Sequence, residues 1–265
     1  MEPPVSTVTV FPGPSPQVRR ISGSDPWNWL AAGWRDMRAF PRFNFGYGAG
    51  FAVFGWIIVA AAVWFRAYYL VLPFTAGFFL LAPILAVGLY EISRRVETGA
   101  TVDWTSILTA WRRNQGQIAL MGFLLLAIHL IWIRIATLLF AIFFSKTPPD
   151  LSNFVIEIVM SSSNIPFLLL GSVIGLLLAT LVFSIAVVSI PMLLDRNVGL
   201  LTAVATSFKA VSENKWPMLV WAVLIVLFIA AGILTGFIGL IVTLPLVAHA
   251  SWHAYRQVVV PASET

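Results

Sequence analysis

The chain contains no cysteine and little charge, and both shortages exclude whole classes of function. Without cysteine it has no disulfide, no thiolate nucleophile and no cysteine-ligated metal centre. Only 10% of its 265 residues are charged, whereas soluble domains carry about 25%. Hydrophobic residues make up 59%, above the roughly 45–50% that is usual for soluble domains. This composition predicts an all-α polytopic membrane protein.

Catalytic motifs are also missing. We find no GxSxG, HExxH, GxGxxG or phosphate-binding loop in a usable context. Intramembrane proteolysis would need paired aspartates, a serine with a histidine, or HExxH inside the spans, and we identify none of these. We therefore expect no enzymatic activity, no cofactor and no metal site. The net charge of +5 does not indicate nucleic acid, because the location of the charges says more than their total in a membrane protein.

The apolar runs predict six transmembrane helices. A helix needs about 20 apolar residues to cross the hydrocarbon core. Lipid has no groups that can form hydrogen bonds with the backbone, so a span must pair its own N–H and C=O groups, as a helix does. The last two spans come from one apolar stretch that is too long for a single crossing, and Gly236 and Gly239 provide a tight turn inside it. The spans are placed at 44–65, 69–92, 117–144, 165–193, 217–235 and 238–255.

The basic residues are divided unequally between the two sides of these spans. Thirteen of the sixteen lysines and arginines lie before the first span, in the second or fourth connection, or after the last span. Arg66 and Lys146 lie on the opposite side, and Arg134 lies within a span. Because cytoplasmic loops are enriched in lysine and arginine, both termini are predicted to be cytoplasmic.

One unit recurs three times: a short aromatic and basic helical stretch followed by a hydrophobic hairpin. In each copy two apolar positions are seven residues apart and a basic residue follows. The pairs are Trp27 and Trp34, Trp104 and Trp111, and, in a degenerate third copy, Leu201 and Phe208. All copies enter from the same side, so the repeats are parallel. Inverted repeats are the better-known sign of alternating access, so parallel repeats make a transporter less expected.

The repeats divide the chain into five parts. A disordered cytoplasmic tail, rich in proline and serine, comes first, and a short tail ends the chain. The second repeat also contains an external amphipathic segment, expected between 145 and 164. The boundaries are 1–24, 25–99, 100–199, 200–257 and 258–265.

The short stretches are predicted to be amphipathic helices at the cytoplasmic interface. Residues seven apart share a helix face, so the tryptophans of a copy point together toward the acyl boundary, and nearby arginines reach anionic headgroups. Anchoring is the plainer interpretation, and a docking surface for a specific lipid or another membrane protein is the alternative. The residues are Trp27, Trp34, Arg35, Arg38, Trp104, Trp111, Arg112 and Arg113.

Arg134 is the first candidate for a ligand or pathway residue. An arginine inside a span costs at least about 2.5–3.5 kcal/mol on insertion scales, which marks it as functional by default. The alternative is that its long stem carries the guanidinium to the outer headgroups. Its candidate partners include Glu157 in the external loop, and His129 is a second polar residue of the same span.

The other polar residues of the spans favour structural interpretations. His249 and His253 are four apart on one face of the last span, where hydrogen bonding between helices is expected more than a metal or haem. Glu91, followed by Arg94 and Arg95 at helical spacing, predicts an interfacial ion pair.

Four segments carry a resemblance to a known family: WLAAGWRDM (29–37), LAPILAVGLYEISRRVE (81–97), AWRRN (110–114) and IWIRIATLLFAIFF (131–144). In these the chain is similar to an uncharacterised family of bacterial integral membrane proteins, a domain of unknown function, over most of its length after the tail. The resemblance implies a bacterial cytoplasmic membrane and a multi-helix fold, and it brings no activity with it.

Two functions remain open at this stage. The first is a non-catalytic accessory, assembly or lipid-organising scaffold in the inner membrane. The second is a small-solute or anion transporter or channel with Arg134 in its pathway. A transporter requires Arg134, His129, Thr137 and Thr180 to line one cavity, whereas a scaffold has a dry interior with Arg134 facing headgroups or a partner.

Overall fold

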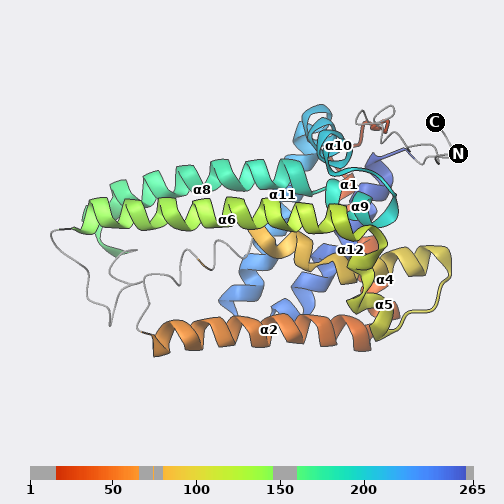
Figure 1. The fold of residues 1–265 in the computed structure, drawn as a ribbon, viewed down its shortest axis with the longest axis horizontal. Helices are drawn as coiled ribbons and strands as arrows, with labels where there is room; N and C mark the ends of the chain where they lie inside the picture. Colours follow the sequence, from red (N-terminus) through yellow and green to blue (C-terminus); the bar gives the residue numbers. More distant parts are fainter. Residues whose placement is uncertain (1–15, 66–73, 75–79, 146–159, 261–265) are drawn as a thin grey trace, which may run out of the picture.

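The computed structural model describes residues 16–65, 74, 80–145 and 160–260. These residues form helices, and they contain no β-strand beyond one isolated bridge between Val18 and Val259. In chain order (Figure 1) the elements are α1 (Asp25–Ala39), α2 (Pro41–Trp64), α4 (Val87–Thr98), α5 (Trp104–Leu108), η2 (Ala110–Asn114), α6 (Gln115–Phe144), η3 (Ser162–Asn164), α8 (Ile165–Ala186), α9 (Ser189–Asp195), α10 (Leu200–Glu213), α11 (Lys215–Leu234) and α12 (Leu240–Val258).

Local sequence signals set several helix ends. Pro41 opens α2 two residues after α1 ends, because proline suits a first helical turn but cannot continue a preceding helix. Gly99 ends α4 in the left-handed region, at φ 68°. Asp103 then caps α5, since its carboxylate accepts a 2.8 Å hydrogen bond from the Ser106 amide. These breaks separate α1 from α2 and α4 from α5.

Among the described residues, four helical segments are long and apolar enough to cross a membrane: 41–64, 110–144, 162–195 and 215–234. They correspond to the first, third, fourth and fifth predicted spans. Most of the second predicted span, 69–92, lies outside the described residues. The sixth forms the helix α12, but α12 is not among the four, because its second half carries polar and basic residues such as His249, His253 and Arg256.

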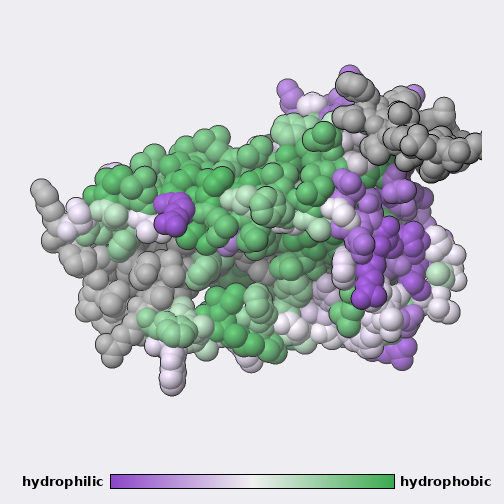
Figure 2. All heavy atoms as spheres, in the orientation of Figure 1, coloured by the Kyte–Doolittle hydropathy of each residue, from purple (hydrophilic) through white to green (hydrophobic). Residues whose placement is uncertain are grey.

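Polar and apolar residues occupy different parts of the molecule. In Figure 2 hydrophilic residues gather at one end, and hydrophobic residues cover most of the remaining visible surface. The short helices α1, α4, α5, α9 and α10 lie at the polar end, and α2, α6 and α8 run away from it (Figure 1). We call these two parts the polar end and the apolar body.

α12 packs against α1, α2, α4, α9 and α11, and its second half lies among the short helices of the polar end. Two glycines lie close to its backbone: a Cβ on Gly33 of α1 would lie 2.7 Å from the Ala250 amide nitrogen, and one on Gly48 of α2 would lie 2.6 Å from the Ile241 carbonyl oxygen. Since only glycine leaves room for this approach, these two residues let α1 and α2 contact the α12 backbone directly.

The connection between α11 and α12 confirms the predicted turn. Gly236 and Phe237 both have positive φ angles, 67° and 68°. The Thr235 hydroxyl accepts a 2.9 Å hydrogen bond from the Gly239 amide, and Trp56 of α2 donates from Nε1 to the Gly236 carbonyl at 2.7 Å. Residues 217–253 therefore form two helices and not one.

The two ends of the described chain lie against each other. The Arg19 amide donates to the Val258 carbonyl at 2.8 Å, and the Val260 amide donates to the Gln17 carbonyl at 3.0 Å. Val18 packs against the core. Residues 16–24, which composition assigns to the disordered tail, thus have defined partners, because a few apolar side chains and backbone groups among them fit the end of α12.

Candidate functional site

Six apolar side chains on the three short segments form an exposed set, which we call the interfacial face. Each segment contributes the two positions seven residues apart, and all six side chains are between 42% and 77% exposed. The residues are Trp27, Trp34, Trp104, Trp111, Leu201 and Phe208. Exposed tryptophan at the end of an apolar bundle is typical of a membrane–water interface.

α1 shows how the fold produces this exposure. One side of the helix is buried: Trp29 stands edge-to-face against Trp221 of α11, with ring centroids 5.6 Å apart, and donates from Nε1 to Gln257 of α12 at 2.5 Å. The other side carries exposed Trp34, Arg35 and other polar or aromatic residues. The amphipathic pattern thus turns one face of α1 to the core and leaves its aromatic and basic face free.

The second segment uses its arginines in two ways. The Arg112 guanidinium lies 5.5 Å from the Trp111 ring centroid, and this side of η2 is exposed. Arg113 instead turns back and donates from Nε to the Leu194 carbonyl at the end of α9, at 3.1 Å. Of the two predicted headgroup ligands on η2, Arg112 faces outward and Arg113 binds the protein.

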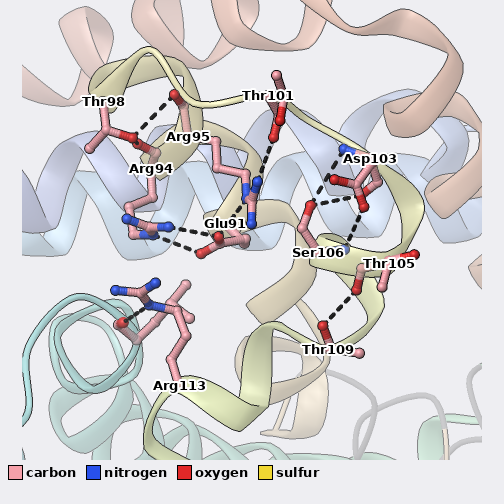
Figure 3. A network of polar contacts seen from close by, with 11 residues as sticks. Glu91, Arg94, Arg95, Thr98, Thr101, Asp103, Thr105, Ser106, Thr109 and Arg113 are labelled. Atoms are coloured by element: carbon pink, nitrogen blue, oxygen red, sulfur yellow. Dashed lines mark hydrogen bonds and ion pairs between the residues drawn. The ribbon is translucent and has the colours of Figure 1, made fainter.

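Beside this segment the predicted ion pair of Glu91 is present (Figure 3). Arg94 binds the Glu91 carboxylate through Nε and Nη2, at 2.7 and 2.8 Å, and Arg95 binds it through Nε at 2.7 Å. Only 2% of the Glu91 side chain is exposed. Arg95 also donates to the Thr101 carbonyl, so the cluster joins α4 to the loop before α5.

A second polar cluster lies deeper, between four helices. His249 of α12 has its Nδ1 2.7 Å from the Ser93 hydroxyl of α4 and its Nε2 2.8 Å from Oδ1 of Asn44 on α2. Ser93 donates to Asp36 of α1 at 2.6 Å, and Nε2 of His253 lies 2.9 Å from the same carboxylate oxygen. We call these five residues the α12 network.

The α12 network is closed to solvent except at one side. His249 and Asn44 are fully buried, Ser93 is almost so, and His253 is partly exposed. Burial alone would raise the pKa of Asp36, but hydrogen bonds with His253 and Ser93 outweigh it and hold the pKa below its usual value. Asp36 is therefore ionised at neutral pH.

The sequence predicts no serine with a histidine inside the spans, and the serine of this network, Ser93, lies just beyond the second predicted span, 69–92. Ser93 and His249 are in contact, although 156 positions separate them in the chain. The pair has no access for a substrate, because Ser93 is 1% exposed and its hydroxyl proton is directed at Asp36. The arrangement joins helices and does not present a nucleophile.

A third polar cluster joins the end of α12 to α9 and α4. The Tyr255 hydroxyl donates to Asp195 of α9 at 2.6 Å, and Arg256 binds Asp195 and Glu97 at 3.3 and 2.9 Å. Trp252 donates to the same glutamate at 3.1 Å. Within the described residues no group of three or more histidines, aspartates or glutamates could hold a metal ion.

The predicted pathway residues are not gathered into one buried site in the described part. Arg134 is exposed on α6, on a side that also exposes Leu130, Ile131 and Leu138. His129 is buried, and its Nδ1 has no hydrogen-bond partner among the described residues. Glu157 lies outside the described residues.

Thr137 and Thr180 are exposed, and each donates to a carbonyl of its own helix, at 2.8 Å. Their hydroxyls are thus used within α6 and α8. This is the usual way in which an apolar helix satisfies a threonine hydroxyl.

Sequence reasoning missed Asp36, Ser93 and Asn44. Each is a single polar residue in an otherwise apolar or amphipathic stretch, and their partners lie 57 to 205 positions away. The available signal was His249, since a histidine in an apolar helix requires partners on neighbouring helices. The sequence does not identify which polar residues those are.

Comparisons with known proteins bear on part of the chain. No curated protein and no solved structure shows significant similarity to it. A family match covers residues 71–195, which include α4, the ion pair of Glu91 and all of α6 to α9. The match is shorter than the resemblance predicts, because the segment 29–37 falls outside it. Residues 71–195 of this integral membrane protein carry the domain described as "Predicted integral membrane protein (DUF2189)", whose function is unknown.

Proposed function

We propose that the protein is a non-catalytic, lipid-organising scaffold of the bacterial inner membrane, with its polar end in the cytoplasm. The observation that carries the proposal is the interfacial face: six exposed apolar side chains accompanied by basic residues, on helices whose opposite sides pack into the protein. Such a surface suits the boundary between acyl chains and anionic headgroups.

The orientation rests on charge. Within the described part, Arg134 is the only basic residue in the middle of a long helix. The other basic residues lie in the short helices or next to them in the chain. The anionic inner leaflet attracts such residues, at about 1 kcal/mol for each lysine or arginine near the surface. Both termini are then cytoplasmic, and six apolar segments lie in the membrane.

The packing of the short helices supports three parallel repeats. α1, from the first copy, packs on α12 of the third; α5, from the second, packs on α4 of the first; and α10, from the third, packs on α8 and α9 of the second. Each short helix therefore lies on the returning helix of another copy, in cyclic order. A ring of this kind places three interfacial segments around one axis, which is how a scaffold would engage several lipids at once.

The alternative of an anion transporter is less well supported. Arg134 lies on a surface that is otherwise apolar, where its stem can reach headgroups without a pathway. His129 is buried, whereas Thr137 and Thr180 face outward and bond to their own helices. These residues give a solute no continuous polar route through the described part.

The proposal is tested by the lipids that the protein retains. Full-length protein is extracted into nanodiscs from membranes that contain zwitterionic and anionic phospholipids, and bound lipid is identified by native mass spectrometry. We expect enrichment of anionic lipid over the bulk membrane, and loss of that enrichment when Arg35, Arg38 and Arg112 are replaced together by alanine.

One control makes the result specific. Trp64→Ala removes an exposed tryptophan at the far end of α2, outside the interfacial face, and it should leave the enrichment unchanged. Unaltered anionic lipid in the triple variant would overturn the lipid role. Co-purification of a stoichiometric protein, lost with the same three arginines, would replace it with a partner-docking role.

A further inference from the structure

The turn between α11 and α12 carries no charge and exposes apolar side chains. Residues 235–239 are threonine, glycine, phenylalanine, isoleucine and glycine, whereas the other two connections on that side of the predicted spans contain Arg66 and Lys146. Leu234 is 86% exposed and Ile238 is 57% exposed. Because exposed leucine and isoleucine are stable in hydrocarbon and costly in water, the composition of the turn favours a position inside the bilayer.

The contacts of the turn with α2 show how far it lies from the polar end. Trp56 donates from Nε1 to the Gly236 carbonyl at 2.7 Å, and a Cβ on Gly55 would lie 2.7 Å from the ring of Phe237. α2 continues past this level to Trp64, and the eight residues from Trp56 to Trp64 extend about 12 Å. Figure 1 likewise shows α2, α6 and α8 extending farther from the polar end than this turn.

α2 itself has the length of a complete crossing. Arg42 lies in its first turn, Trp64 at its end is 83% exposed, and Arg66 follows in the sequence. Basic and aromatic residues of this kind anchor the ends of a span at the two interfaces. The 22 residues from Arg42 to Trp64 extend about 33 Å, close to the roughly 30 Å of the hydrocarbon core. The turn therefore lies about 12 Å short of the far interface, the one remote from the polar end.

α12 gives an independent measure of the same depth. Nε2 of His249 lies 2.8 Å from Oδ1 of Asn44, in the first turn of α2. From His249 back to Gly239 there are ten residues, or about 15 Å, which is half of the hydrocarbon core. α11 is long enough to cross, but it ends at the same turn. Neither helix therefore reaches the far interface.

The turn also meets the requirement that lipid places on irregular backbone. Non-helical N–H and C=O groups at membrane depth need partners within the protein. The amides of Gly236 and Phe237 donate to the Ile233 carbonyl at 3.0 and 3.2 Å. The Gly239 amide donates to the Thr235 hydroxyl at 2.9 Å, and the Gly236 carbonyl accepts from Trp56. A turn in water would not need a tryptophan of a neighbouring helix for this purpose.

We propose that α11 and α12 form a re-entrant hairpin, which enters the bilayer from the polar end, turns back inside the hydrocarbon core and presents Leu234 and Ile238 to acyl chains. The proposal rests on the proposed placement of the apolar body in lipid, but it does not depend on lipid selectivity or on which side is cytoplasmic. The chain then crosses the membrane in the first four predicted spans, and both termini remain on one side.

The depth of spin labels tests the hairpin. The chain has no cysteine, so one thiol at a time is introduced at an exposed position of the full-length protein. The variants are Leu234→Cys at the turn, Ile57→Cys beside Trp56, and Trp64→Cys at the end of α2. Each carries a nitroxide in liposomes of phosphatidylcholine and phosphatidylglycerol, and its collisions with oxygen and with a water-soluble nickel complex are measured.

We expect the labels of Leu234→Cys and Ile57→Cys to lie at equal depth, about 12 Å deeper than that of Trp64→Cys. Both should collide often with oxygen and rarely with nickel. Trp216→Cys, at the exposed start of α11, is the shallow control and should collide with nickel. A label in Leu234→Cys that is as accessible to nickel as the one in Trp64→Cys, or more so, would overturn the hairpin.

Thiol labelling separates the hairpin from the proposed orientation. Ser163, before α8, and Ile238, in the turn, are both exposed. With a membrane-impermeant maleimide we expect Ser163→Cys to react in intact spheroplasts, and Ile238→Cys to react in neither spheroplasts nor inverted vesicles. Reaction of Ile238→Cys in spheroplasts would mean that the turn reaches the far surface. If Ser163→Cys reacts only in inverted vesicles, the proposed orientation is wrong, whereas an unreactive Ile238→Cys still supports the hairpin.

Discussion

The polar end and the apolar body differ in how their residues are fixed. In each of the four candidate spans no more than 44% of the most apolar stretch is buried inside the protein. The apolar body therefore exposes many leucine, valine and phenylalanine side chains. At the polar end most of the second half of α12 is buried and hydrogen-bonded. Because lipid solvates apolar side chains as well as protein does, packing alone specifies the body weakly, whereas directional contacts specify the polar end.

The largest difference in stability between the two parts is expected when a glycine in each is replaced by leucine. Gly33→Leu should destabilise the protein by about 3 kcal/mol, because its side chain would collide with the α12 backbone and overpacking against backbone cannot be relieved by rotamer change. Gly171→Leu on α8 has open space and should change stability by less than about 0.5 kcal/mol. Unfolding is followed in one micelle system. Equal losses of stability in both variants would show that the polar end and the apolar body do not differ in how tightly they are packed.

Two histidines provide the next comparison. His249→Leu removes the partner of Ser93 and Asn44 and should cost at least about 2 kcal/mol, since buried polar groups are left unsatisfied. His129→Leu in α6 should cost clearly less, because its Nδ1 has no partner in the described part of the chain. Chemical unfolding of both variants in the same detergent measures the difference. A larger loss of stability in His129→Leu would mean that His129 in the apolar body contributes more to stability than His249 does.

Acid should act on the polar end through Asp36. Its pKa is lowered by hydrogen bonds in the folded state, so its contribution to stability is complete above the unfolded value of about 3.9 and is lost as pH falls through the folded value. Thermal unfolding across this range should show a decline in the wild type that is reduced in Asp36→Asn. The same decline in both would assign the acid sensitivity to other carboxylates.

The smallest effect is expected in the apolar body. Arg134→Leu replaces an exposed side chain that has neighbours such as Leu130 and Leu138 on its face, and it should change the free energy of unfolding by less than about 0.5 kcal/mol. Reconstituted vesicles should show no altered anion flux. A stability loss above about 2 kcal/mol would mean that Arg134 has a buried partner.

The parts of the fold that could be predicted depend on neighbours in sequence. The turn at Gly236, the ion pairs of Glu91 with Arg94 and Arg95, and the seven-residue spacing of Trp27 and Trp34 are all local patterns, and the structure contains them. Local periodicity determines them, because helix geometry alone brings positions three, four or seven apart onto one face.

The α12 network could not be predicted in the same way. Asp36, Ser93 and His249 come from three different helices, and nothing in the residues between them sets the rotation of one helix against another. That rotation is set by close contacts such as Gly33 on Ala250, which are known only once the helices are packed. The sequence indicates that His249 needs partners, and the fold identifies them.

The central claim, that the polar end faces the cytoplasm and the body lies in lipid, is tested most directly by thiol labelling. The native chain has no cysteine, so Ser212→Cys at the polar end and Leu176→Cys in the body each introduce a single thiol at an exposed position. With a membrane-impermeant maleimide we expect Ser212→Cys to react in inverted vesicles but not in intact spheroplasts, and Leu176→Cys to react in neither. Reaction of Ser212→Cys in spheroplasts, or of Leu176→Cys in either preparation, would contradict the account.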